Sequence, residues 1–120
     1  MGGGPLVVGV DVGTGGCKVA VFDLEGRLAA SAFREYSVLH PRVGWAEQDP
    51  NEWWRAAVEA LREVTRTVAA EDVVAIGLSS QREAFAPLDK QGRVLHNAII
   101  WLDSRATKQE EWVRARVGPR

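Results

Sequence analysis

The stretch GVDVGTGGCK, residues Gly9–Lys18, decides how the chain begins to fold. It follows the apolar run Leu6–Val8 and leads into KVAVFD, residues 18–23, where apolar and polar side chains alternate as they do in a strand. The four glycines of the stretch permit a tight turn between the two extended segments. The stretch therefore predicts a β-hairpin, with Asp11 and Thr14 close to its turn.

Two common glycine-rich phosphate loops do not fit this stretch. A Walker A loop needs Gly-Lys followed by Ser or Thr at the head of a helix, whereas Lys18 follows Cys17 and opens a strand. A dinucleotide fingerprint needs G-x-G-x-x-G leading into a helix, and KVAVFD has strand composition. Any phosphate would therefore bind at a hairpin, with Cys17 as a small filler at the strand start.

The residues of the turn leave two interpretations open. Glycines let backbone N–H groups converge on an anion, Thr14 adds a hydroxyl donor, and Lys18 adds a positive charge. Asp11 repels phosphate unless a Mg²⁺ ion lies between them, held through water. The alternative is a plain hairpin in which the glycines satisfy turn geometry and Asp11 is a local cap.

The following residues predict a meander and then a helix. Residues 27–37 are expected to add a third strand after the turn at Glu25-Gly26. Asp49 as N-cap, Pro50 and Glu52 form a capping-box pattern, and the helix is expected to run to about Ala70. Its expected buried face has helical spacing and consists of Trp54, Ala57, Val58, Leu61, Val64 and Val68.

The second half of the chain predicts one more strand and a last helix. Residues 72–79, DVVAIGLS, form the apolar run that is typical of a strand covered on both faces. Residues 84–88 and 94–100 are expected to be extended, and Asp103 can cap a helix that stops near Gly118. The order β-β-β-α-β predicts an α/β layer protein with a mixed sheet.

The bulk composition excludes several function classes. The chain has 120 residues, which suits one domain, and a net charge of −1, which gives no electrostatic case for nucleic acid or an anionic membrane. Its longest apolar runs are too short to cross a bilayer. A single cysteine and an N-terminus without signal-peptide features favour a cytoplasmic location.

Four motifs in a fixed order add a family resemblance to this interpretation. They are D-x-G-T with a lysine, GWAEQDPNEWW, IGLSSQRE and LDKQGRVLHNAIIWLDSRA, and together they cover about residues 6–105. In this order they resemble the start of the FGGY family of carbohydrate kinases. The resemblance implies an incomplete actin-like ATPase (ribonuclease H-like) domain, namely the N-terminal portion of the first of two lobes.

The resemblance implies that the hairpin grips the phosphates of ATP. The matching positions are Asp11, Gly13, Thr14, Gly15 and Lys18, and Asp11 would organise Mg²⁺ through water. Many relatives carry a hydroxyl residue where this chain has Gly15 and Gly16, so one side-chain contact to the nucleotide is expected to be missing.

The third and fourth motifs are similar to the part of the family that holds a sugar or polyol. The expected contacts are Gln81, Arg82, Glu83, Trp101 and Asp103. An arginine fork and a carboxylate can hold vicinal hydroxyls, although an exposed ion pair between Arg82 and Glu83 is the alternative. Asp103 has two interpretations, helix cap and hydroxyl acceptor.

The GWAEQDP motif receives a structural interpretation. Trp45, Trp53 and Trp54 are expected to anchor loop and helix on the sheet, with sugar stacking as the less favoured alternative. Glu47 and Gln48 could be solvated loop residues.

The resemblance also implies what lies outside this sequence. The family's general base, adenine pocket and second lobe are expected beyond Arg120, so no catalytic residue is assigned here. The parent protein is expected to be an ATP-dependent sugar or polyol kinase and this chain an inactive portion of it. A non-catalytic actin-like module that binds a sugar or nucleotide is the alternative. Apolar surface exposed by the missing part would favour association, so a homo-oligomer stays open.

Overall fold

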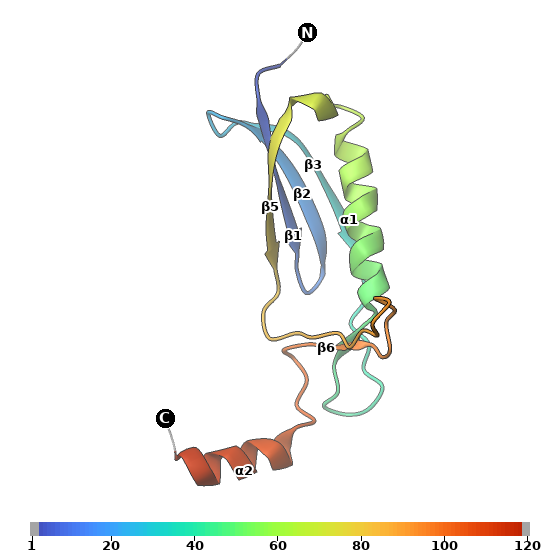
Figure 1. The fold of residues 1–120 in the computed structure, drawn as a ribbon, viewed down its shortest axis with the longest axis vertical. Coiled ribbons are helices and arrows are strands. Elements are labelled where there is room, and N and C mark those ends of the chain that lie inside the picture. Colours follow the sequence, from blue (N-terminus) through green and yellow to red (C-terminus); the bar gives the residue numbers. More distant parts are fainter. Residues whose placement is uncertain (1–2, 119–120) are drawn as a thin grey trace.

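The computed structural model describes residues 3–118, which form one layered α/β unit and a separate helix (Figure 1). The elements in chain order are β1 (Leu6–Val12), β2 (Gly16–Asp23), β3 (Leu28–Glu35), β4 (Glu47–Gln48), α1 (Pro50–Val64), a 3₁₀ turn (Ala70–Asp72), β5 (Val73–Ser80), β6 (Ala98–Ile99) and α2 (Thr107–Val117).

The main sheet has the strand order β3-β2-β1-β5. β1 pairs antiparallel with β2, and β2 antiparallel with β3, whereas β1 and β5 run parallel. The predicted hairpin, meander and β-β-β-α-β order are therefore confirmed. Since β5 enters beside β1, its carboxyl end lies next to the turn that follows β1.

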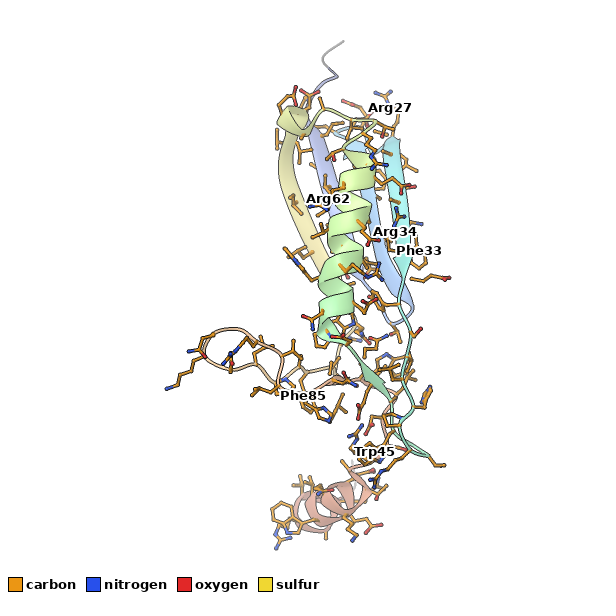
Figure 2. The ribbon with its side chains drawn as sticks, turned by 90° about the vertical axis from the view of Figure 1, so that its right-hand side faces the viewer. Arg27, Phe33, Arg34, Trp45, Arg62 and Phe85 are labelled. Carbon is orange, nitrogen blue, oxygen red and sulfur yellow. The ribbon has the colours of Figure 1, made fainter. Side chains whose placement is uncertain are left out.

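Helix α1 covers one face of the sheet (Figure 2). Alternate side chains of β1 and β2, among them Val8, Val10 and the fully buried Cys17, pack against it. The buried side of α1 consists of Ala56, Ala60 and Val64. The expected buried face is wrong at Trp54, which is 75% exposed, because two alanines let the helix lie close to the sheet and turn Trp54 outward.

The sequence predicted the start of α1 correctly but not its end. Asp49 caps the start, its carboxylate accepting from the N–H of Asn51 at 2.9 Å. Glu52 does not reach back to complete the capping box and pairs with Arg55 instead. The helix ends at Val64, not near Ala70. The Thr65 hydroxyl bonds the Leu61 carbonyl at 3.0 Å, as threonines do where a helix gives way to a turn.

Strand β5 does not have the environment that its composition predicted. It forms the edge of the sheet within residues 3–118, and α1 lies over the other strands. Its apolar side chains Val74, Ile76 and Leu78 are exposed, Leu78 at 81%. The expectation of a strand covered on both faces is therefore wrong for the described chain, because no described element lies over this edge.

The segments after β5 form less regular structure than predicted. Only Ala98–Ile99 becomes a strand, β6, paired antiparallel with β4, and single bridges join Phe85 to Ile99 and Leu88 to Val94. Helix α2 stands apart from the sheet (Figure 1). It begins after Ala106 without a side-chain cap, so the prediction that Asp103 caps it is wrong. No helix within residues 3–118 has the length and apolar character needed to span a membrane.

Candidate functional site

Two hydrogen bonds fix the conformation of the turn after β1. The Gly13 N–H bonds the Gly16 carbonyl at 3.0 Å, and the Tyr36 hydroxyl donates to the Gly13 carbonyl at 2.5 Å. Burial, with a smaller contribution from the charges of Cys17 and Asp11, raises the pKa of Tyr36 to about 12, so the phenol keeps the proton that it donates.

The front of this turn presents free backbone donors. Within residues 3–118 the N–H groups of Thr14 and Gly15 have no hydrogen-bond partner. A Cβ on Gly16 would lie 2.5 Å from the Arg34 carbonyl, whereas a Cβ on Gly15 would meet nothing within 4 Å. Gly16 is therefore required by the close approach of β3, whereas a side chain at Gly15 would point into open space.

Asp11 and Lys18 lie opposite each other on β1 and β2, on the face of the sheet away from α1. Together with Ser79 they line a shallow hollow of about 360 Å³. Both side chains are exposed, and neither forms an ion pair within residues 3–118. One free carboxylate fits a Mg²⁺ ion that is bound mainly by water and phosphate. No group of three or more metal-binding side chains exists in the described chain.

A second hollow, of about 270 Å³, borders the turn at Thr14. It is lined by Thr14, Gln81, Arg82, Glu83 and Trp101. Four of the five residues predicted to hold the acceptor therefore meet in one pocket, and a residue of the predicted phosphate turn forms part of its wall. Asp103 is not among the lining residues.

The pocket sits at the carboxyl end of β5, as predicted. The Gln81 N–H extends the β1–β5 pairing by bonding the Val12 carbonyl at 2.9 Å. Arg82 and Glu83 are exposed and form no ion pair with each other or with any other described residue, so the ion-pair alternative is wrong. Glu83 has φ 57°, a left-handed conformation that costs a residue with a side chain on the order of 1–3 kcal/mol.

A chain of hydrogen bonds joins the turn to the pocket. The Trp101 indole N–H donates to Thr14 Oγ1 at 2.9 Å, and Thr14 Oγ1 donates to Gln81 Oε1 at 3.2 Å. Gln81 Nε2 donates to Gln48 Oε1 at 2.8 Å, and Gln48 Nε2 donates to the Thr14 carbonyl at 2.6 Å. The Thr14 hydroxyl thus donates its proton to Gln81. The expectation that this hydroxyl donates to a phosphate therefore does not match this structure.

Gln48 was missed by the sequence analysis as a member of the site. Gln48 is 1% exposed, so the interpretation as a solvated loop residue is wrong. Its Oε1 also accepts from the Trp53 indole at 3.0 Å. The only sequence signal was its position between Trp45 and Trp53. Of the three tryptophans expected to anchor the loop and helix on the sheet, Trp53 packs against the core, whereas Trp45 lies against Arg105 and Trp54 is exposed.

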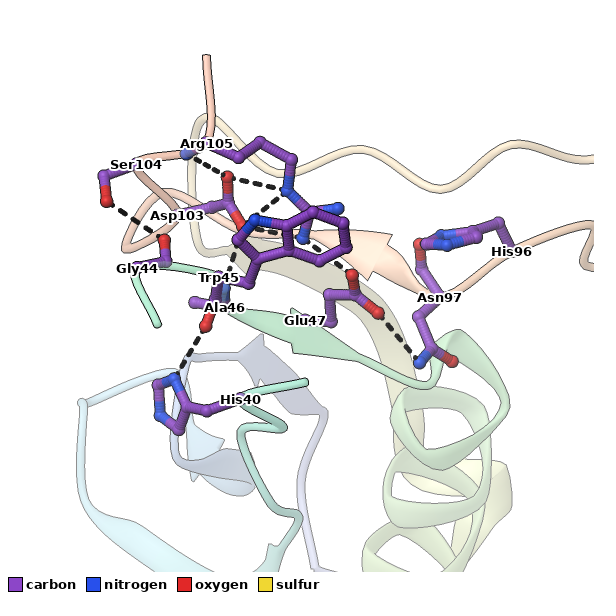
Figure 3. Close-up of polar contacts among 10 residues, drawn as sticks. All are labelled: His40, Gly44, Trp45, Ala46, Glu47, His96, Asn97, Asp103, Ser104 and Arg105. Carbon is purple, nitrogen blue, oxygen red and sulfur yellow. Dashed lines mark hydrogen bonds and ion pairs between the residues drawn. The ribbon is translucent and has the colours of Figure 1, made fainter. Parts of the chain in front are cut away.

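The loop that carries Trp101 is held by a buried charge cluster (Figure 3). Arg105 bridges Glu47 at 2.6 Å and Asp103 at 2.7 Å, and its guanidinium lies 3.7 Å from the Trp45 ring centroid. Both carboxylate side chains are almost fully buried, so Glu47 is not the solvated residue that was considered. The hydrogen bond from Arg105 lowers the pKa of Glu47 below its ordinary value.

Asp103 is fully occupied by this cluster. Its Oδ2 accepts from the Ala46 N–H at 2.8 Å, and its Oδ1 accepts from the Arg105 N–H at 2.9 Å. The Arg105 side chain, and more weakly these N–H groups, lower the pKa of Asp103 to about 2. With 3% of its side chain exposed, Asp103 positions the loop behind Trp101 rather than facing the pocket.

Three features define the structural class of this domain: the strand order, the turn with two unbonded N–H groups, and the pocket at the end of β5. They place the chain among actin-like ATPase domains, in agreement with its similarity to the crystal structure of a xylulose kinase from Rhodospirillum rubrum. That comparison has a TM-score of 0.86 and 31% identity over 94% of this chain and 24% of the other.

Residues 6–118 match the N-terminal domain of the FGGY family of carbohydrate kinases, and the chain belongs to that family. It is 42% identical over 101 residues to a glycerol kinase of Aquifex aeolicus, covering 83% of this chain and 20% of that protein. It is 35% identical over 112 residues to a xylulose kinase of Escherichia coli, covering 93% of this chain and 23% of that protein. The chain thus spans about a fifth to a quarter of these relatives, and the predicted family and fold class are confirmed.

Proposed function

We propose that the protein of which this chain is part transfers the terminal phosphoryl group of ATP to a hydroxyl of a sugar or polyol. One observation carries the proposal: Thr14 belongs both to the turn with two free N–H groups and to the wall of the polar pocket. Phosphoryl transfer needs donor and acceptor side by side and in line, and a wall that the turn and the pocket share supports placing the two side by side.

On the nucleotide side, the N–H groups of Thr14 and Gly15 would hold phosphate oxygens at the glycine turn. Gly13 keeps the turn narrow, and the Lys18 ammonium adds positive charge on the open face of the sheet. The exposed Asp11 carboxylate would hold Mg²⁺ through water, and the ion would neutralise charge on the transferring phosphoryl group.

On the acceptor side, the pocket combines donors, an acceptor and one apolar surface. The Arg82 guanidinium and the Glu83 carboxylate can bind neighbouring hydroxyls by charge-assisted hydrogen bonds. Gln81 fixes the floor, and the half-exposed Trp101 ring can pack against substrate carbon. This set fits an uncharged polyhydroxy compound.

The described carboxylates near the pocket already have other assignments. Asp11 is proposed for the metal and Glu83 for the acceptor, so the general base is proposed to lie in the part of the protein outside this chain. Relatives that are four to five times longer support this, since the chain spans 20% and 23% of two of them. We expect the 120-residue chain alone to be inactive.

A chimera tests the proposal. Residues 6–118 replace the matching segment of the Aquifex aeolicus glycerol kinase, and ATP-dependent phosphorylation of glycerol, xylulose and gluconate is measured. Turnover of at least one acceptor is expected, with none from the 120-residue chain. A folded chimera that binds ATP or acceptor without turnover would support the alternative of a non-catalytic binding module.

A further inference from the structure

We propose that Gln48 is a positioning residue that couples the phosphate turn to the acceptor pocket through a closed ring of hydrogen bonds. The ring consists of Thr14, Gln81 and Gln48, with Trp101 and Trp53 each donating into it from outside. The coupling between phosphate binding and the acceptor pocket rests on the proposed function, whereas the hydrogen-bond ring does not depend on it.

The Trp53 indole determines the direction of every bond in the ring. An indole N–H can only donate, so the atom of Gln48 that faces Trp53 must be its carbonyl oxygen. The amide nitrogen of Gln48 then faces the Thr14 carbonyl, and Gln81 must present its own nitrogen to Gln48. This turns the Gln81 oxygen toward Thr14.

The hydrogen bond at the other end of the ring is compatible with the same arrangement. The Trp101 indole donates to Thr14 Oγ1, which leaves the hydroxyl proton free for Gln81 Oε1. Both donor-only groups are therefore satisfied by one orientation of two amides and one hydroxyl. Reversing any member would bring two donors or two acceptors together in a largely buried place, which is costly.

The ring holds Thr14 at two points, its carbonyl through Gln48 and its hydroxyl through Gln81. The N–H groups of Thr14 and Gly15 remain without a hydrogen-bond partner within residues 3–118. The Gly15 N–H shares its peptide unit with the Thr14 carbonyl, which accepts from Gln48, whereas the Thr14 N–H shares its peptide unit with the Gly13 carbonyl, which accepts from Tyr36. A phosphate that moves the Gly15 N–H must therefore also move the carbonyl that is bonded to Gln48. That movement reaches Trp53 through Gln48, and it reaches the pocket wall through Gln81.

The burial of Gln48 makes this role specific to its side chain. The residue is 1% exposed, and within the described chain no buried side-chain polar atom lacks a partner. A methionine of similar length would fill the space without either hydrogen-bonding group. Gln48→Met therefore removes the ring with little change in volume.

The experiment uses the chimera of residues 6–118 with the Aquifex aeolicus glycerol kinase, labelled with ¹⁵N, so that the part of the protein outside this chain is supplied, and its first arm needs no ligand. The reporter is the indole N–H of Trp101, which donates to Thr14 and not to Gln48. In Gln48→Met its exchange with water should become roughly fivefold faster, the factor that the loss of one net hydrogen bond corresponds to. Gln91→Met, at an exposed turn position, is the matched control and should leave the exchange unchanged.

A second variant keeps this arm decisive if Gln48→Met does not fold. Gln81→Met opens the same ring at a partly exposed residue and should speed the exchange of the Trp101 indole to a similar extent. Unchanged Trp101 exchange in whichever variant folds would overturn the ring. The Trp112 indole, on α2, is the internal reference.

The second arm adds ATP with Mg²⁺ and follows the amide signals of Thr14 and Gly15 and the indole signal of Trp53. In the protein without the substitution all three signals should shift, and in Gln48→Met the shift of the Trp53 signal should be lost. If the two amide signals shift while the Trp53 signal does not in the unsubstituted protein, the proposed coupling is overturned. If the amides themselves do not shift, the proposed phosphate role fails, and the ligand-free arm still decides the ring.

Discussion

The Trp101 indole donates a hydrogen bond of 2.9 Å to the Thr14 hydroxyl, although the two residues are 87 positions apart in the chain. Thr14 lies in the tight turn after β1, and Trp101 lies in the loop after β6. This bond makes the glycine turn one wall of the polar pocket. Everything that holds the Trp101 loop in place therefore also shapes the space beside the turn.

Removing Arg105 should destabilise the fold strongly. Arg105→Met leaves the buried carboxylates of Glu47 and Asp103 without their cation, and breaking a buried ion pair in this way costs about 3–5 kcal/mol. Denaturant unfolding measures the free energy. The matched control is Arg93→Met, whose side chain is 77% exposed and pairs with Asp89, and it should cost at most about 1 kcal/mol. Equal effects of the two variants would contradict the structural role of the cluster.

Acid should weaken the fold through Asp103. Its pKa is held at about 2, below the ordinary value of 3.8, so the folded state binds this proton less readily than the unfolded state. The contribution of Asp103 to stability is fully present above its unfolded pKa and is lost as the pH falls through about 2. Asp103→Asn should flatten this part of the stability curve, measured by thermal unfolding at a series of pH values.

The two adjacent glycines of the turn should respond differently to alanine. In Gly16→Ala the new Cβ would lie 2.5 Å from the Arg34 carbonyl and from the Phe33 ring, so overpacking should cost about 1–3 kcal/mol. In Gly15→Ala the Cβ has nothing within 4 Å, and stability should change by less than about 0.5 kcal/mol. Chemical denaturation of both variants makes the comparison. A tolerated Gly16→Ala would mean that β3 does not approach the turn as closely as described.

The Glu83 carboxylate should be needed for the acceptor. In the chimera with the Aquifex aeolicus kinase, Glu83→Gln should raise the acceptor KM by about 10-fold or more, since a charge-assisted hydrogen bond contributes about 1.5–3 kcal/mol. The KM for ATP should stay within about twofold. An unchanged acceptor KM would leave Glu83 as a surface charge. Because φ at Glu83 is 57°, Glu83→Gly should also stabilise the fold slightly by relieving backbone strain.

Asp11→Asn in the same chimera tests the proposed metal role. Asparagine keeps the shape of the side chain but removes the charge that would hold Mg²⁺, so kcat should fall by at least about 100-fold with thermal unfolding unchanged. A higher Mg²⁺ requirement in the variant is the specific sign of a metal role. Turnover equal to that of the original chimera would show that Asp11 does not organise the ion.

The local elements of the fold were predictable because their determinants lie within a few residues of each other. Gly13 to Gly16 form the turn with one hydrogen bond, and Asp49 caps α1 through the N–H of Asn51 two residues later. The element order predicted a mixed sheet, and the structure shows that its parallel pair is β1 and β5. The resemblance supplied the roles of Gln81, Arg82, Glu83 and Trp101, and the structure brings all four to one pocket.

The sequence by itself thus determined the hairpin, the helix start and the family of this protein. Only the tertiary structure decided that Gln48 is buried at the centre of the site, that Asp103 is bound to Arg105 and not to α2, and that Trp54 faces solvent. The physical reason is the range of the interactions. Turns and caps depend on neighbouring residues, whereas the bond from Gln48 to Thr14 spans 34 positions and exists only after α1 has packed on the sheet.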